Sequence, residues 1–225
     1  MKTTAIIVAA GTGSRFGSQI PKQFIELAGK PVVVYAIERF AEASSIDEIV
    51  VVVTSENIPR LGGVHIAKPI HIVTGGATRA ESVANGLRAV DDDGDIVAVH
   101  DGARPFVSAD EIDRMIAKAK ETGAACLVAP VTDTIKSISG NEITATLDRD
   151  KLRRALTPQA FRTDLLRRAF ELGDVSETVT DECYLVEKLG HPISLVEGSA
   201  RNIKITTAED LRVAEMIMES EKVRR

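Results

Sequence analysis

The chain has no tryptophan, only two cysteines, and no apolar stretch that reaches the roughly 18 residues of a membrane-spanning helix. The cysteines, Cys126 and Cys183, are far apart in apolar surroundings, so we expect buried free thiols rather than a disulfide or a zinc pair. The four histidines show no metal-ligand spacing. We therefore expect no membrane partner, no disulfide scaffold and no cysteine or histidine metal site.

An excess of positive charge is also missing, because the formal net charge at pH 7 is −5. A general nucleic-acid-binding surface is therefore disfavoured, and we expect no nucleic-acid partner. The 225 residues are 44% hydrophobic and 27% charged, which predicts a single globular domain over residues 1–225. Residues 1–4 lack the cleavage region of a signal peptide, so we expect a cytoplasmic protein.

Segments with the pattern of buried strands alternate with segments of helical spacing. The expected strands cover residues 6–9, 48–54, 70–74, 96–100, 124–131 and 193–197. The expected helices cover about 33–43, 78–90, 108–123, 163–172, 181–189 and 207–220. Capping boxes are expected for three helices, at Thr78 and Glu81, Ser108 and Glu111, and Thr206 and Glu209. This alternation predicts an α/β fold with a doubly wound, mostly parallel, Rossmann-like sheet.

One insertion breaks the alternation. Residues 132–139 and 141–147 alternate polar and apolar side chains around a hairpin turn at Ser139-Gly140-Asn141. This pattern predicts a protruding β-arm inserted at about residues 132–155. The edges of such an arm would be exposed unless they paired with another chain, so we expect a homodimer formed through the arm.

A glycine-rich loop follows the first expected strand directly. It holds three glycines within residues 11–17, together with Arg15, and Lys22 follows shortly after. Glycines let backbone N–H groups approach an anion, and the two cations add positive charge for phosphate oxygens. Because ligands bind at the carboxyl ends of strands in open α/β sheets, the pattern predicts a phosphate-binding loop.

Other readings of this loop remain open. Phe16 stands where the dinucleotide fingerprint requires its third glycine, and no P-loop motif is present. A plain glycine-rich turn with two solvated cations is the simplest alternative. The loop, with Pro21-Lys22-Gln23 after it, resembles instead the signature loop of nucleotidyltransferases that activate sugar phosphates.

Two further sites are expected at the same edge of the sheet. Asp101 ends a strand beside the expected triphosphate, where a carboxylate could hold Mg²⁺, or could simply cap the turn and pair with Arg104. Gly76 precedes a helix whose first turn carries Arg79 and Ser82, which could contact a nucleoside. A plain strand-to-helix turn explains the second pattern almost as well.

The remaining candidates lie in the arm and near the carboxyl end of the chain. Thr134 and Arg149 belong to the arm, from which they could reach the active site of a neighbouring subunit, although each alone would pass for a surface residue. Lys204 lies between apolar neighbours at what we take as an alternating strand position before a helix, where a lysine is usually solvated.

Taken together, the ordered motifs resemble the 2-C-methyl-D-erythritol 4-phosphate cytidylyltransferase family of the non-mevalonate isoprenoid pathway over essentially the whole chain. The motifs that carry the resemblance are Ala9-Ala10-Gly11-x-Gly13-x-Arg15, Pro21-Lys22-Gln23, Gly75-Gly76-x-x-Arg79, His100-Asp101-x-Ala103-Arg104-Pro105, Ala129-Pro130-Val131, Asp133-Thr134-Ile135-Lys136, Asp148-Arg149, Leu156-Thr157-Pro158-Gln159, Thr180-Asp181-Glu182, Val196-Glu197-Gly198, Asn202-Ile203-Lys204 and Glu209-Asp210-Leu211.

The resemblance implies conversion of CTP and methylerythritol 4-phosphate to CDP-methylerythritol and pyrophosphate, by in-line attack on the α-phosphate and with Mg²⁺ as cofactor. It implies that Arg15 and Lys22 stabilise charge at the α-phosphorus. Arg149 from the partner subunit and Lys204 would grip the polyol phosphate, assisted by Thr134. The expected nucleotide-binding residues are Ala9, Ala10, Gly11, Thr12, Gly13, Gly76, Arg79, Ser82, Asp101 and Ala103, with Asp101 also the expected metal ligand.

Two departures from the family pattern stand out, Arg201 in place of an acid and Ala77 in place of an aspartate. The nearest rival is a cytidylyltransferase for ribitol 5-phosphate, which the small residues after Asp101 disfavour. A nicotinamide-dependent oxidoreductase is disfavoured by Phe16 and Lys22. A non-catalytic nucleotide-binding module would not need four cations around one pocket.

Overall fold

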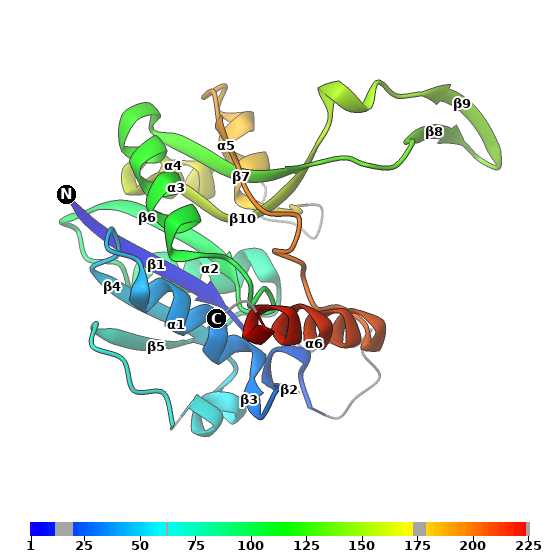
Figure 1. Ribbon diagram of the computed structural model, residues 1–225. Helices are drawn as coiled ribbons and strands as arrows, with labels where there is room; N and C mark the ends of the chain where they lie inside the picture. Colours follow the sequence, from blue (N-terminus) through cyan, green and yellow to red (C-terminus); the bar gives the residue numbers. More distant parts are fainter. Residues whose placement is uncertain (12–19, 62, 173–178, 224–225) are drawn as a thin grey trace.

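The computed structural model describes residues 1–11, 20–61, 63–172 and 179–223, which are built around a seven-stranded sheet of order β11-β7-β10-β6-β1-β4-β5 (Figure 1). Its strands are β1 (Lys2–Val8), β4 (Glu48–Val53), β5 (Ile70–Thr74), β6 (Gly94–Asp101), β7 (Ala124–Pro130), β10 (Arg153–Arg162) and β11 (Ser194–Glu197). β10 runs antiparallel to both of its neighbours, and the other pairings in this sheet are parallel. The expected α/β fold with a mostly parallel sheet is confirmed.

Helices cover both faces of the sheet, because successive side chains of each strand point to opposite sides. Ile7 packs in one apolar cluster with α1 (Val32–Glu42) and α3 (Ala109–Thr122). Its neighbour Ile6 packs in the other cluster, with α2 (Arg79–Arg88), α4 (Thr163–Leu172) and α5 (Glu182–Lys188). The last helix, α6 (Ala208–Val223), packs beside the small β2–β3 hairpin (Glu26–Leu27 and Lys30–Pro31), as Figure 1 shows.

The order of the strands reverses at β1, and this reversal locates the ligand-binding edge. From β1 the sheet continues to β4 and β5 on one side and to β6 on the other. The carboxyl ends of β1 and β6 are joined there, since the N–H of Gly102 donates to the carbonyl of Val8 at 2.9 Å. Open α/β sheets bind ligands in the crevice at such a switch point.

The central antiparallel strand β10 is a feature that the sequence pattern did not reveal. Its ten residues include Pro158, which has no N–H to donate and which argues against a central strand. The register with β7 is interrupted between Ala155 and Gln159, so Pro158 lies where no ladder bond is required. The strand continues past this interruption and pairs Gln159 with Cys126.

Two helices begin much as their capping residues predicted. Ser108 and Glu111 form the expected reciprocal box at the start of α3. At the start of α2, Thr78 Oγ1 accepts the N–H of Glu81 at 3.1 Å. The carboxylate of Glu81, however, accepts the N–H of Ala77 at 2.7 Å, so the return bond expected to Thr78 goes one residue upstream.

The third box was wrong by one residue. Thr207, not Thr206, caps α6, and its Oγ1 accepts the N–H of Asp210 at 3.3 Å. The carboxylate of Asp210 in turn accepts the N–H groups of Thr206 and Thr207, each at 2.8 Å. Because this carboxylate bonds two N–H groups at once, Asp210 rather than Glu209 sets the start of the helix.

The arm leaves the body of the protein as a separate two-stranded ribbon, β8 (Lys136–Ser139) and β9 (Glu142–Thr146), as Figure 1 shows. Gly140 makes the expected hairpin turn with a φ of 57°, a left-handed conformation that glycine adopts without strain. Ile138 and Ile143 lie opposite each other and are 69% and 66% exposed. The protruding arm therefore presents apolar side chains outside the core.

Candidate functional site

The side chain of Gln23 holds the backbone that directly follows β1. Its amide nitrogen donates to the carbonyl of Ala9 at 2.6 Å and to that of Gly11 at 2.8 Å, and the side chain is only 2% exposed. Lys22 lies beside it, at the start of the short 3-10 helix Lys22–Phe24. Gln23 therefore ties Lys22 to the end of β1, a role that the sequence alone did not assign.

Three of the expected site residues, Thr12, Gly13 and Arg15, lie outside the described residues. Ala9 and Ala10 are buried, at 2% and 6% exposure, directly after β1. Their small side chains leave room for the backbone of neighbouring loops.

The second expected nucleotide loop packs against the first. A Cβ added to Gly75 would lie 2.3 Å from the Cβ of Ala10, so only glycine allows this approach. The next residue, Gly76, donates its N–H to Ser82 Oγ at 3.1 Å, and Ser82 is 2% exposed. The structure thus brings Ala10, Gly76 and Ser82 together, as the sequence predicted for one nucleotide site.

Within the described ranges, three cations surround the carboxylate of Asp101. Arg79 Nε lies 3.1 Å from Oδ1, while Arg104 Nε and Lys204 Nζ lie 3.3 Å and 2.8 Å from Oδ2. Asp101 is 6% exposed, so these contacts are shielded from water. The alternative pairing of Asp101 with Arg104 is therefore present, and Lys204 joins it.

Lys204 reaches this cluster from a loop and not from a strand, so the strand position expected for it was wrong. Residues 202–206 have no strand structure. Instead, the N–H of Ile205 donates to the carbonyl of Ala103 at 2.9 Å, which anchors the loop beside the turn after β6. A single backbone bond of this kind leaves no alternating pattern in the sequence.

Glu182 supplies a second carboxylate that sequence reasoning did not single out. It is 0% exposed at the start of α5, and its two oxygens accept Nη1 and Nη2 of Arg79 at 2.6 Å and 3.0 Å. Arg79 therefore bridges Glu182 and Asp101, and links α2 to α5 and to the end of β6.

Burial alone would raise the pKa of Asp101, but the charges of Arg79, Lys204 and Arg104 outweigh it and hold the pKa well below its ordinary value. Burial likewise would lower the pKa of Arg79, yet Glu182 and Asp101 raise it above its usual range. Both groups are therefore ionised at neutral pH. The described members of the cluster, three cations and two carboxylates, carry one net positive charge, which suits a phosphate.

Two expected residues stay apart from this cluster in a single chain. Thr134 and Arg149 are exposed on the arm, and Arg149 Nη1 donates to the carbonyl of Thr132 at 3.0 Å. The arm reaches away from the sheet in Figure 1. The described part of one chain thus joins Ala10, Gly76, Ser82, Asp101 and Lys204 at one edge and leaves Thr134 and Arg149 outside it.

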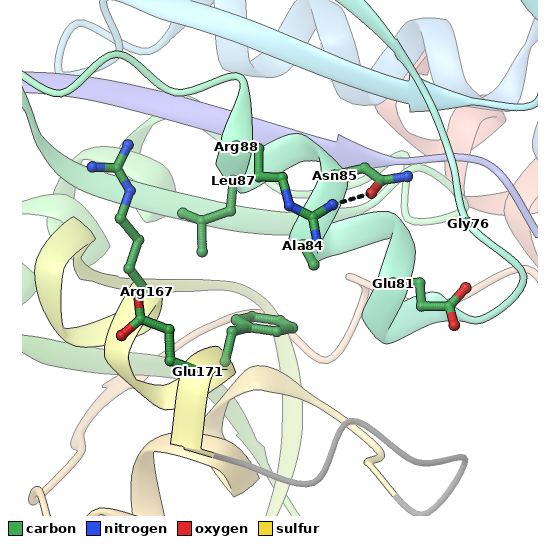
Figure 2. A pocket seen from close by; sticks show the side chains of 9 residues that line it. Gly76, Glu81, Ala84, Asn85, Leu87, Arg88, Arg167 and Glu171 are labelled. Carbon is green, nitrogen blue, oxygen red and sulfur yellow. Dashed lines mark hydrogen bonds between the residues drawn. The ribbon is translucent and has the colours of Figure 1, made fainter.

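A cavity of about 650 Å³ lies between α2 and α4 and borders this edge (Figure 2). Leu87 and Phe170 contribute apolar surface, and Arg88 Nη1 donates to Asn85 Oδ1 at 2.6 Å on its wall. Gly76 lines the cavity, whereas Asp101 and Lys204 do not. The charged cluster therefore lies outside this cavity.

The described ranges were expected to hold neither a cysteine or histidine metal site nor a disulfide. Among these residues, no three histidine, cysteine, aspartate or glutamate side chains gather as a metal-binding group. Both cysteines are free and buried, as expected. None of the helices described combines the length and apolar character needed to cross a membrane.

Comparison with known proteins gives consistent matches over nearly the whole length of the chain. A family model described as 2-C-methyl-D-erythritol 4-phosphate cytidylyltransferase matches residues 3–220. The protein of that name from Rhodopirellula baltica is 44% identical over 230 residues, covering 96% of this chain and 94% of the relative. The one from Endomicrobium trichonymphae is 44% identical over 221 residues, covering 98% and 100%.

Solved structures agree with this result. The crystal structure of 4-diphosphocytidyl-2C-methyl-D-erythritol synthase from Anaerococcus prevotii matches with a TM-score of 0.86 at 30% identity, covering 97% of this chain and 96% of that one. The 2-C-methyl-D-erythritol 4-phosphate cytidylyltransferase of Thermus thermophilus matches with a TM-score of 0.77 at 33% identity, covering 97% and 100%. The chain belongs to the 2-C-methyl-D-erythritol 4-phosphate cytidylyltransferase family.

Proposed function

We propose that this protein transfers the cytidylyl group of CTP to 2-C-methyl-D-erythritol 4-phosphate and releases pyrophosphate. The observation that carries the proposal is the cationic cluster on Asp101, set beside the Ala10 and Gly76 loops at the switch point of the sheet. Membership of the family supplies the substrates. The family members named above act on methylerythritol phosphate, which supports this substrate over ribitol 5-phosphate.

The chemistry needs positioning and charge more than a general base. A phosphate oxygen of the polyol is already ionised at neutral pH, so it can attack the α-phosphorus without losing a proton to the protein. Negative charge on the phosphorus oxygens grows in the transition state. Arg15 and Lys22 are proposed to stabilise that charge selectively, which lowers the barrier instead of merely tightening binding.

Lys204 is proposed to hold the phosphate of the polyol. Its ammonium already lies 2.8 Å from Asp101 and its side chain is 34% exposed, so it is both oriented and accessible to a ligand. The nucleotide is proposed to lie along Ala9, Ala10, Gly11, Gly76, Ser82 and Ala103, with Thr12 and Gly13 assigned from the sequence alone.

Asp101 has a carboxylate lone pair that could coordinate Mg²⁺. Among the described residues, Oδ1 accepts one N–H, from Arg79, whereas Oδ2 is bonded to both Arg104 and Lys204. Each carboxylate oxygen offers two lone pairs, so Oδ1 keeps one position for a metal ligand. Because Mg²⁺ in phosphate sites is usually held by one or two carboxylates and by substrate oxygens, one aspartate is sufficient. When bound, the ion would neutralise charge on the triphosphate.

The arm is proposed to complete the site of a second copy in a homodimer. Ile138 and Ile143 are more than half exposed on a ribbon in which two described strands pair, and such hairpins are marginally stable alone. Docking on a partner would bury both side chains and would carry Thr134 and Arg149 to the partner's Asp101 cluster. The cytoplasmic location and the absence of a nucleic-acid partner remain predictions.

Pyrophosphate release tests the proposal. The protein is incubated with CTP, Mg²⁺ and either methylerythritol 4-phosphate or ribitol 5-phosphate, with UTP and ATP in parallel. Release only with CTP and the methylerythritol substrate supports the proposal. Preference for ribitol 5-phosphate would identify that compound as the substrate instead. No release with any pair would refute cytidylyl transfer.

Lys204→Ala provides the matched test of the site, with Lys118→Ala as its control. Lys118 also pairs with a carboxylate, that of Glu121 at 2.5 Å, but on the exposed surface of α3. We expect Lys204→Ala to lower kcat/KM for the polyol phosphate by about 100-fold or more, and Lys118→Ala to leave it unchanged. Equal effects of the two substitutions would contradict the role of Lys204.

A further inference from the structure

His100 occupies a position that the proposed reaction does not use. It lies in β6 directly before Asp101 and is 0% exposed. Its ring packs against Phe40, with 4.9 Å between ring centroids and 52° between planes. Histidine is the residue type that most often acts as a general base, so a histidine directly before Asp101 invites that assignment.

Both ring nitrogens are already engaged within the protein. Nε2 lies 3.0 Å from the carbonyl oxygen of Arg104, and Nδ1 lies 3.0 Å from Thr157 Oγ1. A carbonyl oxygen can only accept, so Nε2 must carry the hydrogen. Thr157 Oγ1 accepts the N–H of Asp101 at 3.1 Å and has one hydrogen of its own, which it can donate to the unprotonated Nδ1.

These bonds close a ring around the turn that follows β6. The turn itself has a bond from the N–H of Arg104 to the carbonyl of Asp101 at 3.0 Å. His100 holds the far end of the turn through Arg104, and Thr157, reaching over from β10, holds the near end through Asp101. These bonds therefore fix the backbone of the turn across which the Asp101 carboxylate and the Arg104 guanidinium meet.

The hydrogen bonds around the turn extend to the loop that carries Lys204. Asn202 Nδ2 donates to the carbonyl of Thr157 at 2.8 Å, and Arg104 Nη1 donates to the carbonyl of Asn202 at 2.9 Å. Lys204, two residues further on, then meets Asp101 at 2.8 Å. Displacement of the turn would thus move both partners of the Asp101–Lys204 pair.

We propose that His100 is a positioning residue, whose neutral imidazole, with its hydrogen on Nε2, fixes the turn at 101–104 and so holds Asp101 and Lys204 in the geometry that receives the polyol phosphate. It is not a general base, because Nε2 already carries a hydrogen and the lone pair of Nδ1 already accepts a hydrogen bond from Thr157. The functional part of this inference rests on the proposed cytidylyl transfer, whereas the bonding pattern does not.

Three substitutions separate the bonds from the shape of the ring. His100→Phe keeps an aromatic ring against Phe40 but loses both hydrogen bonds. His100→Gln retains a donor toward Arg104, and His100→Asn retains an acceptor toward Thr157. We expect kcat/KM for methylerythritol phosphate to fall about 10- to 100-fold in His100→Phe, and less in the other two, at unchanged overall fold by circular dichroism.

A role limited to filling space predicts the opposite order, with the phenylalanine variant the most active of the three. Full activity of a folded His100→Phe would therefore overturn the proposal. If that variant does not fold, wild-type kcat/KM in both His100→Gln and His100→Asn would overturn it equally.

His191→Gln is the matched control, since His191 Nε2 also lies within bonding distance of a backbone carbonyl, that of Thr122 at 3.2 Å. The His191 ring packs at the end of α3, beside Gly123, and we expect unchanged kinetics. A loss equal to that of His100→Gln would show that such bonds act only through general stability.

Nitrogen-15 NMR of the ligand-free protein tests the bonding pattern without any turnover. We expect the imidazole of His100 to be neutral at pH 7, with its hydrogen on Nε2. A hydrogen on Nδ1, or on both nitrogens, would overturn the proposal. If the wild-type protein released no pyrophosphate, the cytidylyl transfer would fail, while this spectrum would still decide how His100 is bonded.

Discussion

The bidentate pair of Arg79 and Glu182 allows the energetics of the site to be tested by one substitution. Glu182→Gln keeps the shape of the side chain but removes its charge, and it turns an amide N–H₂ toward one guanidinium nitrogen. Glu182 is 0% exposed and accepts bonds of 2.6 Å and 3.0 Å, so water cannot replace what is lost. A hydrogen bond to a charged partner contributes about 1.5–3 kcal/mol.

Losing one such bond and weakening the other should lower the free energy of unfolding by about 2–4 kcal/mol. In a domain of 225 residues, each kcal/mol corresponds to roughly 2–4 °C in Tm, so we expect Tm to fall by about 4–16 °C. Thermal and urea unfolding, followed by circular dichroism, measure both quantities.

Glu197→Gln is the control for this experiment. Glu197 also pairs with an arginine, Arg153, at 3.0 Å, but its side chain is 57% exposed. Exposed pairs contribute about 0–1 kcal/mol, so Tm should barely change. The reasoning from burial is refuted if Glu182→Gln destabilises the protein no more than Glu197→Gln does.

Three further predictions concern His100, Gly75 and the proposed dimer. Burial lowers the pKa of His100 from 6.5 to about 4, so the unfolded chain binds a proton on this ring more readily than the folded protein does. The free energy of unfolding should therefore fall by about 3 kcal/mol as the pH drops from 6.5 to 4. Urea titrations should show a smaller loss in His100→Gln, and an equal loss in that variant would contradict the prediction. Gly75→Ala places a Cβ 2.3 Å from the nearest side-chain carbon and should cost about 1–3 kcal/mol in unfolding experiments, whereas Gly63→Ala, with nothing within 4 Å, should cost little. In the proposed dimer, Arg149→Ala and Lys22→Ala should each be inactive and should regain pyrophosphate release when mixed; no recovery despite demonstrated subunit exchange would argue against a shared site.

The sheet could be predicted from the sequence wherever its strands are buried on both faces. β4 is buried at every position, and its run of isoleucine and valine marks it clearly. β10 could not be found in this way, because Pro158 and the polar residues Thr157 and Gln159 interrupt any apolar pattern. These side chains are accommodated by the break in register and by bonds to distant segments, which are tertiary features.

The residues of the site were predictable as types but not as contacts. The strand ends placed Asp101, Gly76 and Ser82 at one edge, and the structure brings them there. Arg79 was expected to bind nucleotide, yet its guanidinium nitrogens bond Asp101 and Glu182, the latter 103 positions away. A pairing over that separation depends on how α5 packs, and no local pattern encodes it.

Gln23 illustrates the same limit at short range. It belongs to the Pro21-Lys22-Gln23 motif, in which the lysine is the obvious functional residue. Its amide nitrogen donates to the carbonyls of Ala9 and Gly11, so it orders the backbone that follows β1 next to Lys22. Sequence pattern identifies the charge, whereas the structure identifies what holds the charge in place.

The origin of the bridging oxygen in the product tests the central claim most directly. The protein is incubated with CTP, Mg²⁺ and methylerythritol 4-phosphate labelled with oxygen-18 in its phosphate, and the products are followed by phosphorus-31 NMR. We expect a cytidine diphosphate diester that retains all of the label, one labelled oxygen bridging the two phosphorus atoms, together with unlabelled pyrophosphate. Unconsumed CTP, or label in the pyrophosphate, would contradict attack by the polyol phosphate on the α-phosphorus.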